Sequence, residues 1–325
     1  MNPNKFIILM LAVMFSFAVS SCDKNDSLLE YQEVESNVEP NNVVEKATTR
    51  ASFHAIPSGA IPSNWTIPQG YSGNGVALLK PSNVPNDQMA NIYVIAVDLR
   101  YAKVGMVYDL KPNSETFYKK SLANWNSYGN FFAIANSLFF DGRAKYPSLP
   151  FPFRQGSGFV TNGNGGSQKD ALREKFALNI KLDEGYAEII SIGGKGYKQG
   201  KKVIYVPCNT SGMTERSYSG FYGNVGNNDG VAGKTLIGIR DLNKDGKCEM
   251  LYLLVSSRKS GKNQEAVYNI LKDEFKCSHS INFDGGGSSQ LICKNSEKIV
   301  SSDLADKGYR RSIPVCIVIK EHGVE

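Results

Sequence analysis

Histidine, tryptophan and cysteine are scarce in this sequence of 325 residues, which holds 3 His, 2 Trp and 6 Cys. The histidines His54, His279 and His322 are far apart, which gives little support to a three-histidine metal site or a Ser-His-Asp triad. The cysteine spacing is neither that of a dense disulfide scaffold nor that of a zinc knuckle. Most cysteines after position 22 lie in or beside apolar runs such as "QLICK", which is typical of small buried hydrophobic residues. We expect no metal and no cofactor.

Signatures for nucleotide and nucleic-acid binding are also lacking. The glycine-rich stretch of the chain is not followed by a helix, as a dinucleotide fold requires, and no Gly-Lys-Ser/Thr marks a P-loop. The net charge is only +6 and no basic run carries interleaved aromatic residues, so nucleic acid is not an expected partner. Residues 60–325 contain no internal repeat and no Pro/Gly/Ser linker, which favours one domain.

The long hydrophobic run of the chain is N-terminal. Lys5 precedes "FIILMLAVMFSFAV" and small residues follow, which is the plan of a secretory signal peptide over residues 1–21. "VSSC" resembles a bacterial lipobox, in which cleavage leaves Cys22 to be acylated, and an ordinary signal peptide that ends near a cysteine is the alternative. Residues 22–59 are acidic and poor in aromatic residues, typical of a disordered tether. We expect an exported protein, lipid-anchored in the bacterial cell envelope on its periplasmic face or at the cell surface.

Strand-like segments dominate the remaining chain. They are rich in β-branched and aromatic residues, at positions 91–99, 104–110, 131–140, 201–208 and 311–320. Hairpin turns are predicted at 183–185 and 245–246. The second turn begins like a calcium loop, but Tyr252 stands where the twelfth-position glutamate belongs, so a hairpin turn explains it better. Helical spacing is found around 263–276 and 121–129. These segments predict the α+β class, with mixed, largely antiparallel sheets and a few helices in a single globular domain over residues 60–325.

The stretch "INFDGGGSSQLI" places an acid and three glycines between two apolar segments. The second segment is itself strand-like, so the glycines join strand to strand. Residues without Cβ let a ligand approach the backbone, and successive N–H groups can line an anion pocket; a tight hairpin that merely tolerates glycine is the alternative. Strand alternation predicts that Asn282 and Asp284 point to the same face. The candidate site therefore comprises Asn282, Asp284, Gly285, Gly286, Gly287 and Ser288.

Several segments together resemble the phosphodiester glycosidase family. "SINFDGGGSSQL" is similar to the family signature "NLDGGGS", and "AIANSLFFDG" looks like its "AINGGFF" segment, with Asn136 on the motif asparagine. "GKTLIGI" is similar to "RTAIG" and puts Thr235 on a matching position. "SSR" ends at Arg258 where "DGR" is usual, and "RSIPVCIV" resembles the closing strand, with Arg311 on its arginine. The resemblance runs in order over residues 130–319, and only the glycine signature is specific by itself.

The sequence departs from the family pattern at three places. Ser137 and Leu138 replace two glycines, Lys234 replaces an arginine, and Ser256 and Ser257 stand where Asp-Gly is common. A lysine keeps the charge but loses the planar fork that grips an oxyanion through two donors. The phosphate pocket or the substrate is therefore expected to differ from that of the family's enzyme that removes N-acetylglucosamine from a phosphodiester.

The resemblance implies a glycoside hydrolase that cleaves a bond like that of a GlcNAc-1-phosphodiester. Asp284 would be the carboxylate that acts as base or nucleophile, and Asn136 and Asn282 would bind sugar hydroxyls or orient Asp284. The phosphate would be received by the amides of Gly285, Gly286 and Gly287 and by Ser288, Thr235, Lys234, Arg258 and Arg311.

Three questions stay open at the level of the sequence. A glycosidase usually has a second carboxylate, and no spacing selects among Glu215, Asp229 and Asp98. A lipid-anchored carbohydrate- or polyanion-binding protein with the same fold and no turnover is the alternative function, and phosphoester hydrolysis with P–O cleavage is a third. The expected partners are a phosphorylated glycan or sugar phosphodiester and, through Cys22, a membrane, with the oligomeric state open.

Overall fold

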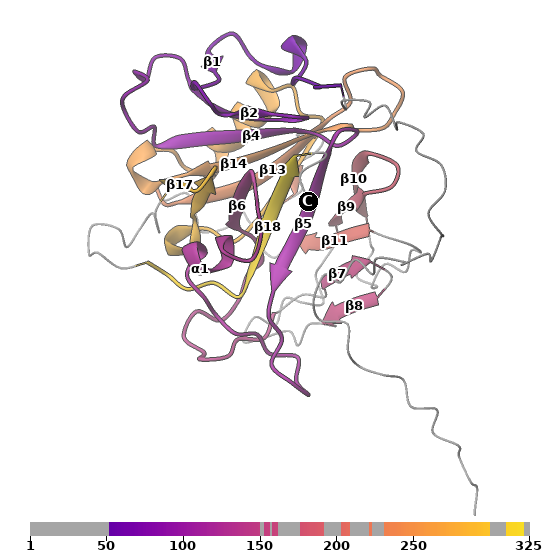
Figure 1. Ribbon diagram of the computed structural model, residues 1–325, viewed down its shortest axis with the longest axis vertical. Coiled ribbons are helices and arrows are strands. Elements are labelled where there is room, and N and C mark those ends of the chain that lie inside the picture. The colour runs from indigo at the N-terminus through magenta and orange to yellow at the C-terminus, as the bar shows by residue number, and fades with distance from the viewer. Residues whose placement is uncertain are drawn as a thin grey trace, which may run out of the picture. The chain divides into compact units, whose positions relative to one another are not determined.

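The computed structural model describes residues 52–149, 153–156, 158–161, 176–191, 203–208, 221–222, 231–299 and 310–321. All of them belong to one compact unit, Lys46–Glu325. Their strands form three sheets, which confirms the predicted α+β class with mostly antiparallel pairing (Figure 1). The predicted signal peptide and Cys22 lie outside the described residues.

The largest sheet consists of β1 (Trp65–Thr66), β2 (Ser72–Gly73), β3 (Val76–Pro81), β4 (Ile92–Asp98), β12 (Phe221–Tyr222), β13 (Lys234–Arg240), β14 (Met250–Ser256) and β15 (His279–Asn282). Its order is β1-β3-β4-β14-β13-β15-β12, with β2 paired to β3. Within the described residues of this sheet, only β12 and β15 pair in parallel. β4 and β14 are buried along their whole length, as expected for strands covered on both faces.

Two five-stranded sheets complete the fold. One has the order β17-β16-β6-β18-β5, and its strands are β5 (Ala102–Tyr108), β6 (Ala133–Asn136), β16 (Leu291–Cys293), β17 (Ser296–Ile299) and β18 (Val315–Glu321). The other has the order β10-β9-β11-β7-β8, and its strands are β7 (Phe153–Gly156), β8 (Gly158–Thr161), β9 (Phe176–Lys181), β10 (Tyr186–Ser191) and β11 (Val203–Cys208). Figure 1 shows the long neighbours β5 and β18 running side by side.

Alternating side chains of the largest sheet enter two different cores. Ile237 and Leu253 pack in one core with Ala135 and Ile317 of the sheet that contains β6 and β18. Their neighbour Leu236 belongs to the other core, on the opposite face. The two sheets therefore pack face to face, and the strand ends at their common edge bring β6, β13 and β15 together.

Helices cover the outer faces of these two sheets. On the largest sheet lie α2 (Gln264–Asn269), which Asn263 caps by accepting from the Ala266 N–H, and the π-helical turn η4 (Ile270–Glu274). Val267 and Phe275 of this segment enter the second core, which confirms the predicted helical stripe. On the sheet with β6, the helix α1 (Leu122–Asn126) buries Trp125 completely.

Predicted strands and turns are found with changed bounds in two places. The predicted strand 131–140 is ordered as β6 only over Ala133–Asn136, and the last strand begins at Val315 rather than at 311. Pro314 has no N–H to give to a ladder, which accounts for the later start. Both predicted hairpins, β9–β10 and β13–β14, are confirmed.

The folded unit begins before residue 60, where the sequence placed the end of a disordered tether. Residues Ser58–Ala60 form the 3-10 turn η1, Ile56 is buried, and the rings of His54 and Tyr101 stack. The tether prediction is therefore wrong for residues 52–59, because apolar residues near its end are buried against α2 and the largest sheet.

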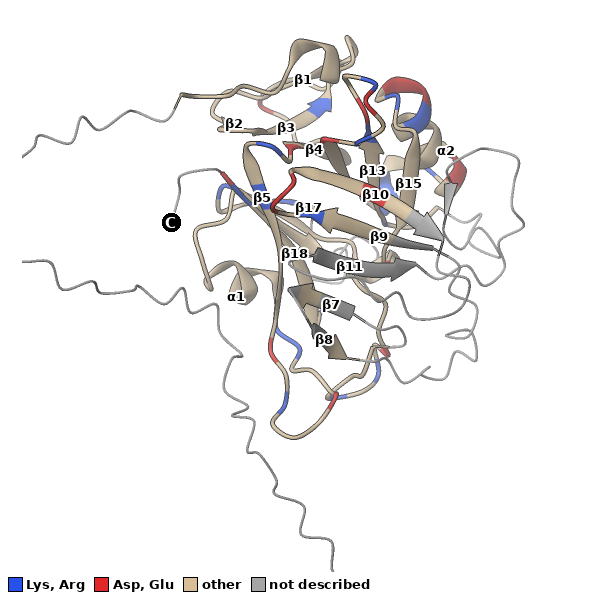
Figure 2. Ribbon diagram, turned by 90° about the vertical axis from the view of Figure 1, so that its right-hand side faces the viewer, with Lys and Arg blue, Asp and Glu red and all other residues tan. Residues whose placement is uncertain are grey.

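The charged residues are spread over the described chain, and its free cysteines are buried. Basic and acidic residues are interspersed along the described chain and do not gather on a single strand or helix (Figure 2). Among the described residues, Cys248, Cys277, Cys293 and Cys316 are free and buried, where burial raises the pKa of each thiol. No described helix is long and apolar enough to span a membrane.

Candidate active site

The glycine loop carries the chain from the largest sheet to its neighbour. β15 ends at Asn282, and the Phe283 N–H still reaches β13 by donating to the Thr235 carbonyl at 2.8 Å. The next amide, that of Asp284, donates instead to the Ser137 carbonyl at 2.9 Å, just beyond β6. After the 3-10 turn η5 (Gly286–Ser288) the chain enters β16, which pairs with β6. The loop is therefore a crossing between two sheets and not a hairpin.

Asn136, at the end of β6, holds this crossing in place. Its Nδ2 donates to the Asp284 carbonyl at 2.6 Å, and its Oδ1 accepts from the Thr235 hydroxyl at 2.9 Å and from the Gln290 N–H at 3.1 Å. Asn136 is 1% exposed and Thr235 is 0% exposed. Thr235 was predicted to bind phosphate, and Asn136 to bind sugar hydroxyls or orient Asp284; in the structure both act as braces, because their polar atoms bind other groups of the protein.

The local structure requires glycine at two of the three positions of the loop, Gly285 and Gly286. A Cβ on Gly285 would lie 2.8 Å from the Gly233 carbonyl oxygen, and Gly286 has a φ of +60°, which favours glycine. The Gly286 N–H donates to Gly233 at 2.8 Å, and the Gly285 N–H donates to the Asp284 carboxylate at 3.0 Å. Within the described residues, no hydrogen bond occupies the Gly287 N–H. The predicted row of three open amide donors is thus reduced, because two of them bind the protein itself.

Asp284 is the partly buried carboxylate at the start of the loop. Burial raises its pKa from 3.8 to about 6, against the opposing effects of a hydrogen bond from Ser288, the positive charge of Arg311 and the Gly285 amide. A carboxyl group whose pKa lies this near neutrality can exchange protons at physiological pH, as general bases do.

Arg311 links the segment before β18 to the loop. Its Nη1 donates to the Ser288 Oγ at 3.4 Å, and its carbonyl accepts from the Gln290 Nε2 at 2.9 Å. Ser288 is fully buried and connects the guanidinium to the Asp284 carboxylate. The structure thus brings together Asp284, Ser288, Arg311 and the glycine turn, as the sequence predicted.

Other predicted residues are placed away from this group. β13 pairs Leu236 with Asn282, so Asn282 shares the α2 face of the sheet with Leu236 and does not point with Asp284. The prediction failed because strand alternation ends where β15 ends. Lys234 is buried, and alternation along β13 puts it on the opposite face from Thr235. Arg258 is exposed in the 3-10 turn η3 (Arg258–Ser260), and its charge is not among those that shift the pKa of Asp284.

The second carboxylate is not Asp98. This residue pairs with Met250, whereas the candidate site lies at the end of β14 where Ser256 pairs with Lys234, about 20 Å away at the rise of a strand. Asp98 is also 1% exposed and is bound by Arg100 through two bonds of 2.6 and 2.8 Å. The other two candidates, Glu215 and Asp229, lie outside the described residues.

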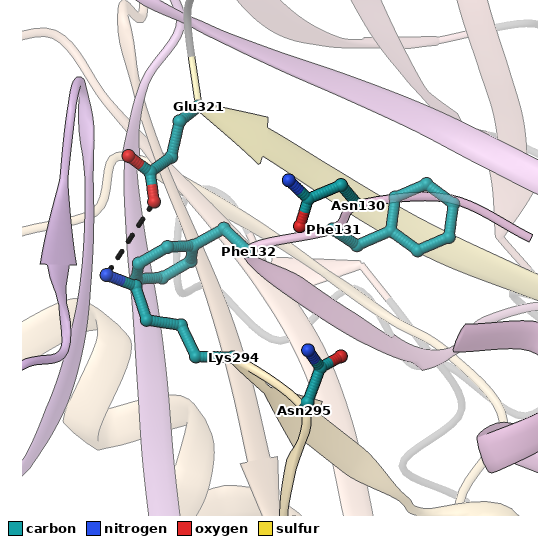
Figure 3. Close-up of a pocket in the computed structure, with 6 residues that line it drawn as sticks. All are labelled: Asn130, Phe131, Phe132, Lys294, Asn295 and Glu321. Carbon is teal, nitrogen blue, oxygen red and sulfur yellow. Dashed lines mark ion pairs between the residues drawn. The ribbon is translucent and has the colours of Figure 1, made fainter. Parts of the chain in front are cut away.

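A pocket of about 180 Å³ opens at the far end of β6 from the candidate site. Figure 3 shows Asn130 and Asn295 beside Phe132, with Lys294 and Glu321 forming an ion pair of 3.7 Å across it. None of the predicted site residues lines it. It is a separate polar recess and is not the candidate active site.

Sequence reasoning missed five residues of the site region. Gln290 and Ser137 belong to segments that were singled out, but nothing in their type showed that they would hold backbone groups of the crossing. Gly233 and Asp141 also lie in quoted segments, whereas Lys119 comes from another part of the chain, and only the fold places these three near Arg311 and the glycine loop.

A protein-family model described as phosphodiester glycosidase matches residues 129–320, which is more than half of the chain. The chain belongs to the phosphodiester glycosidase family. Members of this family are hydrolases, which agrees with a carboxylate of raised pKa in the family's glycine signature. No curated protein matches the sequence.

One solved structure shares the fold of this chain. The catalytic domain of zebrafish N-acetylglucosamine-1-phosphodiester alpha-N-acetylglucosaminidase, auto-inhibited by its pro-peptide, is similar with a TM-score of 0.50 and 16% identity, over 84% of this chain and 96% of that one. A hypothetical protein from Synechocystis gives a TM-score of 0.49 at 9% identity over 77% of this chain. The chain spans 63% of the length of the Synechocystis protein.

Proposed function

We propose that this member of the phosphodiester glycosidase family hydrolyses a sugar-1-phosphodiester, with a bond like that of a GlcNAc-1-phosphodiester. The observation that carries the proposal is the Asp284 group: a carboxyl with a pKa of about 6 is joined through Ser288 to the guanidinium of Arg311. A carboxylate for the sugar and a cation for the phosphate are thus side by side.

The chemistry of the substrate fits this pair. Cleavage of the bond between the anomeric carbon and the oxygen releases a phosphate monoester, whose second pKa is about 6, so the group leaves with the bonding electrons and needs little protonation. Arg311 stabilises the negative charge that grows on this phosphate. Asp284, ionised above about pH 6, acts at the anomeric carbon, either as the base that takes a proton from the attacking water or as the nucleophile.

The place of action that we propose is the bacterial cell envelope. An N-terminal signal peptide followed by Cys22 in "VSSC" would leave the mature chain attached to a membrane by a lipid. A tethered hydrolase of this kind acts on phosphorylated glycans of the envelope or on glycans that reach the cell from outside.

The decisive experiment is an assay of residues 46–325 with a GlcNAc-1-phosphodiester, in parallel with Asp284→Ala. We expect release of the sugar by the native protein and a loss of at least about a hundredfold in kcat/KM in the variant, as general base catalysis contributes on that scale. Full activity in Asp284→Ala would overturn the role of this residue. In ¹⁸O-labelled water the label should enter the sugar; label in the phosphate would establish P–O cleavage instead.

A second candidate is binding without turnover. It is favoured by the engaged amides of Gly285 and Gly286, which leave fewer donors for a phosphate than the sequence suggested. The same assay separates the two functions. A native protein that binds the phosphodiester in calorimetry and releases no sugar over days would establish a lipid-anchored carbohydrate- or polyanion-binding protein.

A further inference from the structure

We propose that Lys119 is a phosphate-binding residue and forms one anion subsite with Arg311. The inference rests on the proposed function and deepens it by naming a substrate contact outside residues 129–320, the part of the chain that the family model matches.

The backbone around Lys119 is fixed on two sides. Phe117 donates its N–H to the Pro147 carbonyl at 2.8 Å, and Lys120 exchanges two backbone hydrogen bonds of 3.1 and 2.9 Å with Ile313. The segment is thus held between the chain that leaves β6 and the chain that enters β18. These are the two segments that carry Ser137 and Arg311, so the fold delivers the Lys119 side chain to the edge of the candidate site.

A continuous series of contacts joins Lys119 to the catalytic candidate. Its Nζ donates to the Gly142 carbonyl at 3.2 Å, and the Cβ position of Gly142 lies 3.8 Å from the Arg311 Nη1. Arg311 in turn reaches Ser288, which bonds Asp284. The ammonium and the guanidinium are therefore both close to Gly142, and both belong to partly buried side chains.

The electrostatics of this arrangement favour an anion. Burial is the main effect and lowers the pKa of Lys119; the negative charge of Asp141 raises this pKa, and the positive charge of Arg311, a smaller effect, lowers it. Two neighbouring cations are both stabilised when an anion of charge −1 or −2 binds between them. Asp141 is exposed and offers only a screened counter-charge. The Gly142 carbonyl takes one of the three ammonium donors, so the others suit the oxygens of a phosphate.

The test measures binding of inorganic phosphate and of GlcNAc-1-phosphate to residues 46–325 by calorimetry at pH 7. Lys119→Met should weaken both about tenfold and reduce the dependence of the affinity on salt, while Lys119→Arg should restore most of the affinity because the charge is kept. Lys320→Met is the matched control: this lysine is also partly buried, but it lies at the other end of β18 over the Phe131 ring. The control should bind phosphate like the native protein. Thermal unfolding of each variant checks that the fold is intact.

The outcomes separate this inference from the proposed function. Unchanged phosphate affinity in a folded Lys119→Met variant overturns the subsite, whatever the catalytic assay gives, and so does a native protein that binds no phosphate. If the affinity falls in the variant while the native protein cleaves no phosphodiester, the subsite stands and the proposed hydrolysis fails. If the native protein is active, Lys119→Met should raise the KM by more than it lowers kcat.

Discussion

At the scale of single residues, hydrogen bonds within the protein fix the position of the polar groups around the candidate site. Asn136 uses both ends of its amide to bind the Asp284 carbonyl, the Thr235 hydroxyl and the Gln290 N–H. Each of these bonds is buried or partly buried, so an unsatisfied partner would cost about 1 to 3 kcal/mol. These bonds fix the backbone of Asp284. Asn136 does not bind the Asp284 carboxyl group, which is therefore available for the reaction.

Asp284 should weaken the fold at neutral pH. Its pKa in the folded protein is about 6, above the ordinary value of 3.8, so ionisation is less favourable in the folded than in the unfolded chain. The contribution of protonated Asp284 to the free energy of unfolding is therefore fully present below about pH 4 and is lost as the pH rises through about 6. We expect Asp284→Asn to increase the free energy of unfolding at pH 7 by about 1 to 2 kcal/mol, after allowance for partial exposure, and to have little effect at pH 4.

Urea unfolding of the native protein and of Asp284→Asn at pH 4 and pH 7 measures this difference. Asp183→Asn is the control, because Asp183 is exposed in the β9–β10 turn and should change stability by less than about 0.5 kcal/mol. An Asp284→Asn variant that is less stable than the native protein at pH 7 would show that the bonds from Ser288 and Gly285 outweigh burial.

At the scale of elements, the glycine crossing depends on close approach between two loops. Gly285 and Gly233 come from different segments, and the Gly233 carbonyl accepts the Gly286 N–H at 2.8 Å. We expect Gly285→Ala to destabilise the fold by about 1 to 3 kcal/mol, because its Cβ would lie 2.8 Å from that carbonyl oxygen. It should also lower kcat, since the movement that relieves the clash displaces Asp284. Thermal unfolding and the phosphodiester assay measure the two effects.

Gly59→Ala is the control for this substitution, because nothing lies within 4 Å of the Cβ that it adds. Equal stability of the two variants would mean that the crossing has room to relax. In that case the glycines would be explained better by a bound ligand than by the approach of Gly233.

The elements that could be predicted from the sequence are those with local causes. β4, β5, both hairpins and the α2 stripe follow from β-branched runs, turn residues and helical spacing. The sheet to which each strand belongs does not follow from local pattern. Asn282 and Asp284 were therefore given a common face on the assumption of one continuous strand, whereas the chain turns from β13 toward β6 between them. The resemblance to the family pointed to Asp284, Ser288 and Arg311, and it could not tell a brace such as Asn136 from a group that meets the substrate.

At the scale of the whole molecule, residues from distant parts of the chain complete the site and the core. Lys119 is joined to the loop of Asp284 through Gly142 and Arg311, which lie far from it in the sequence, so no spacing in the sequence pointed to it. The N-terminal segment 52–67 is a similar case, because it shows no regular helix or strand pattern of its own. Yet Trp65 donates its indole N–H to Glu274 at 2.5 Å, and Tyr252 donates its hydroxyl to the Ala60 carbonyl at 3.0 Å.

This packing predicts where the chain can be shortened. A protein that begins at residue 52 keeps Ile56, Ala60 and Trp65, which are 8%, 0% and 5% exposed, and should unfold at the same temperature as a protein of residues 46–325. A protein that begins at residue 68 loses all three from the core beside α2. Loss of a buried tryptophan alone costs about 3 to 5 kcal/mol, so we expect a fall in the unfolding midpoint of at least about 10 °C or a failure to fold. Calorimetry of the two shortened chains decides the point, and equal midpoints would show that residues 52–67 only lie against the largest sheet and do not stabilise it.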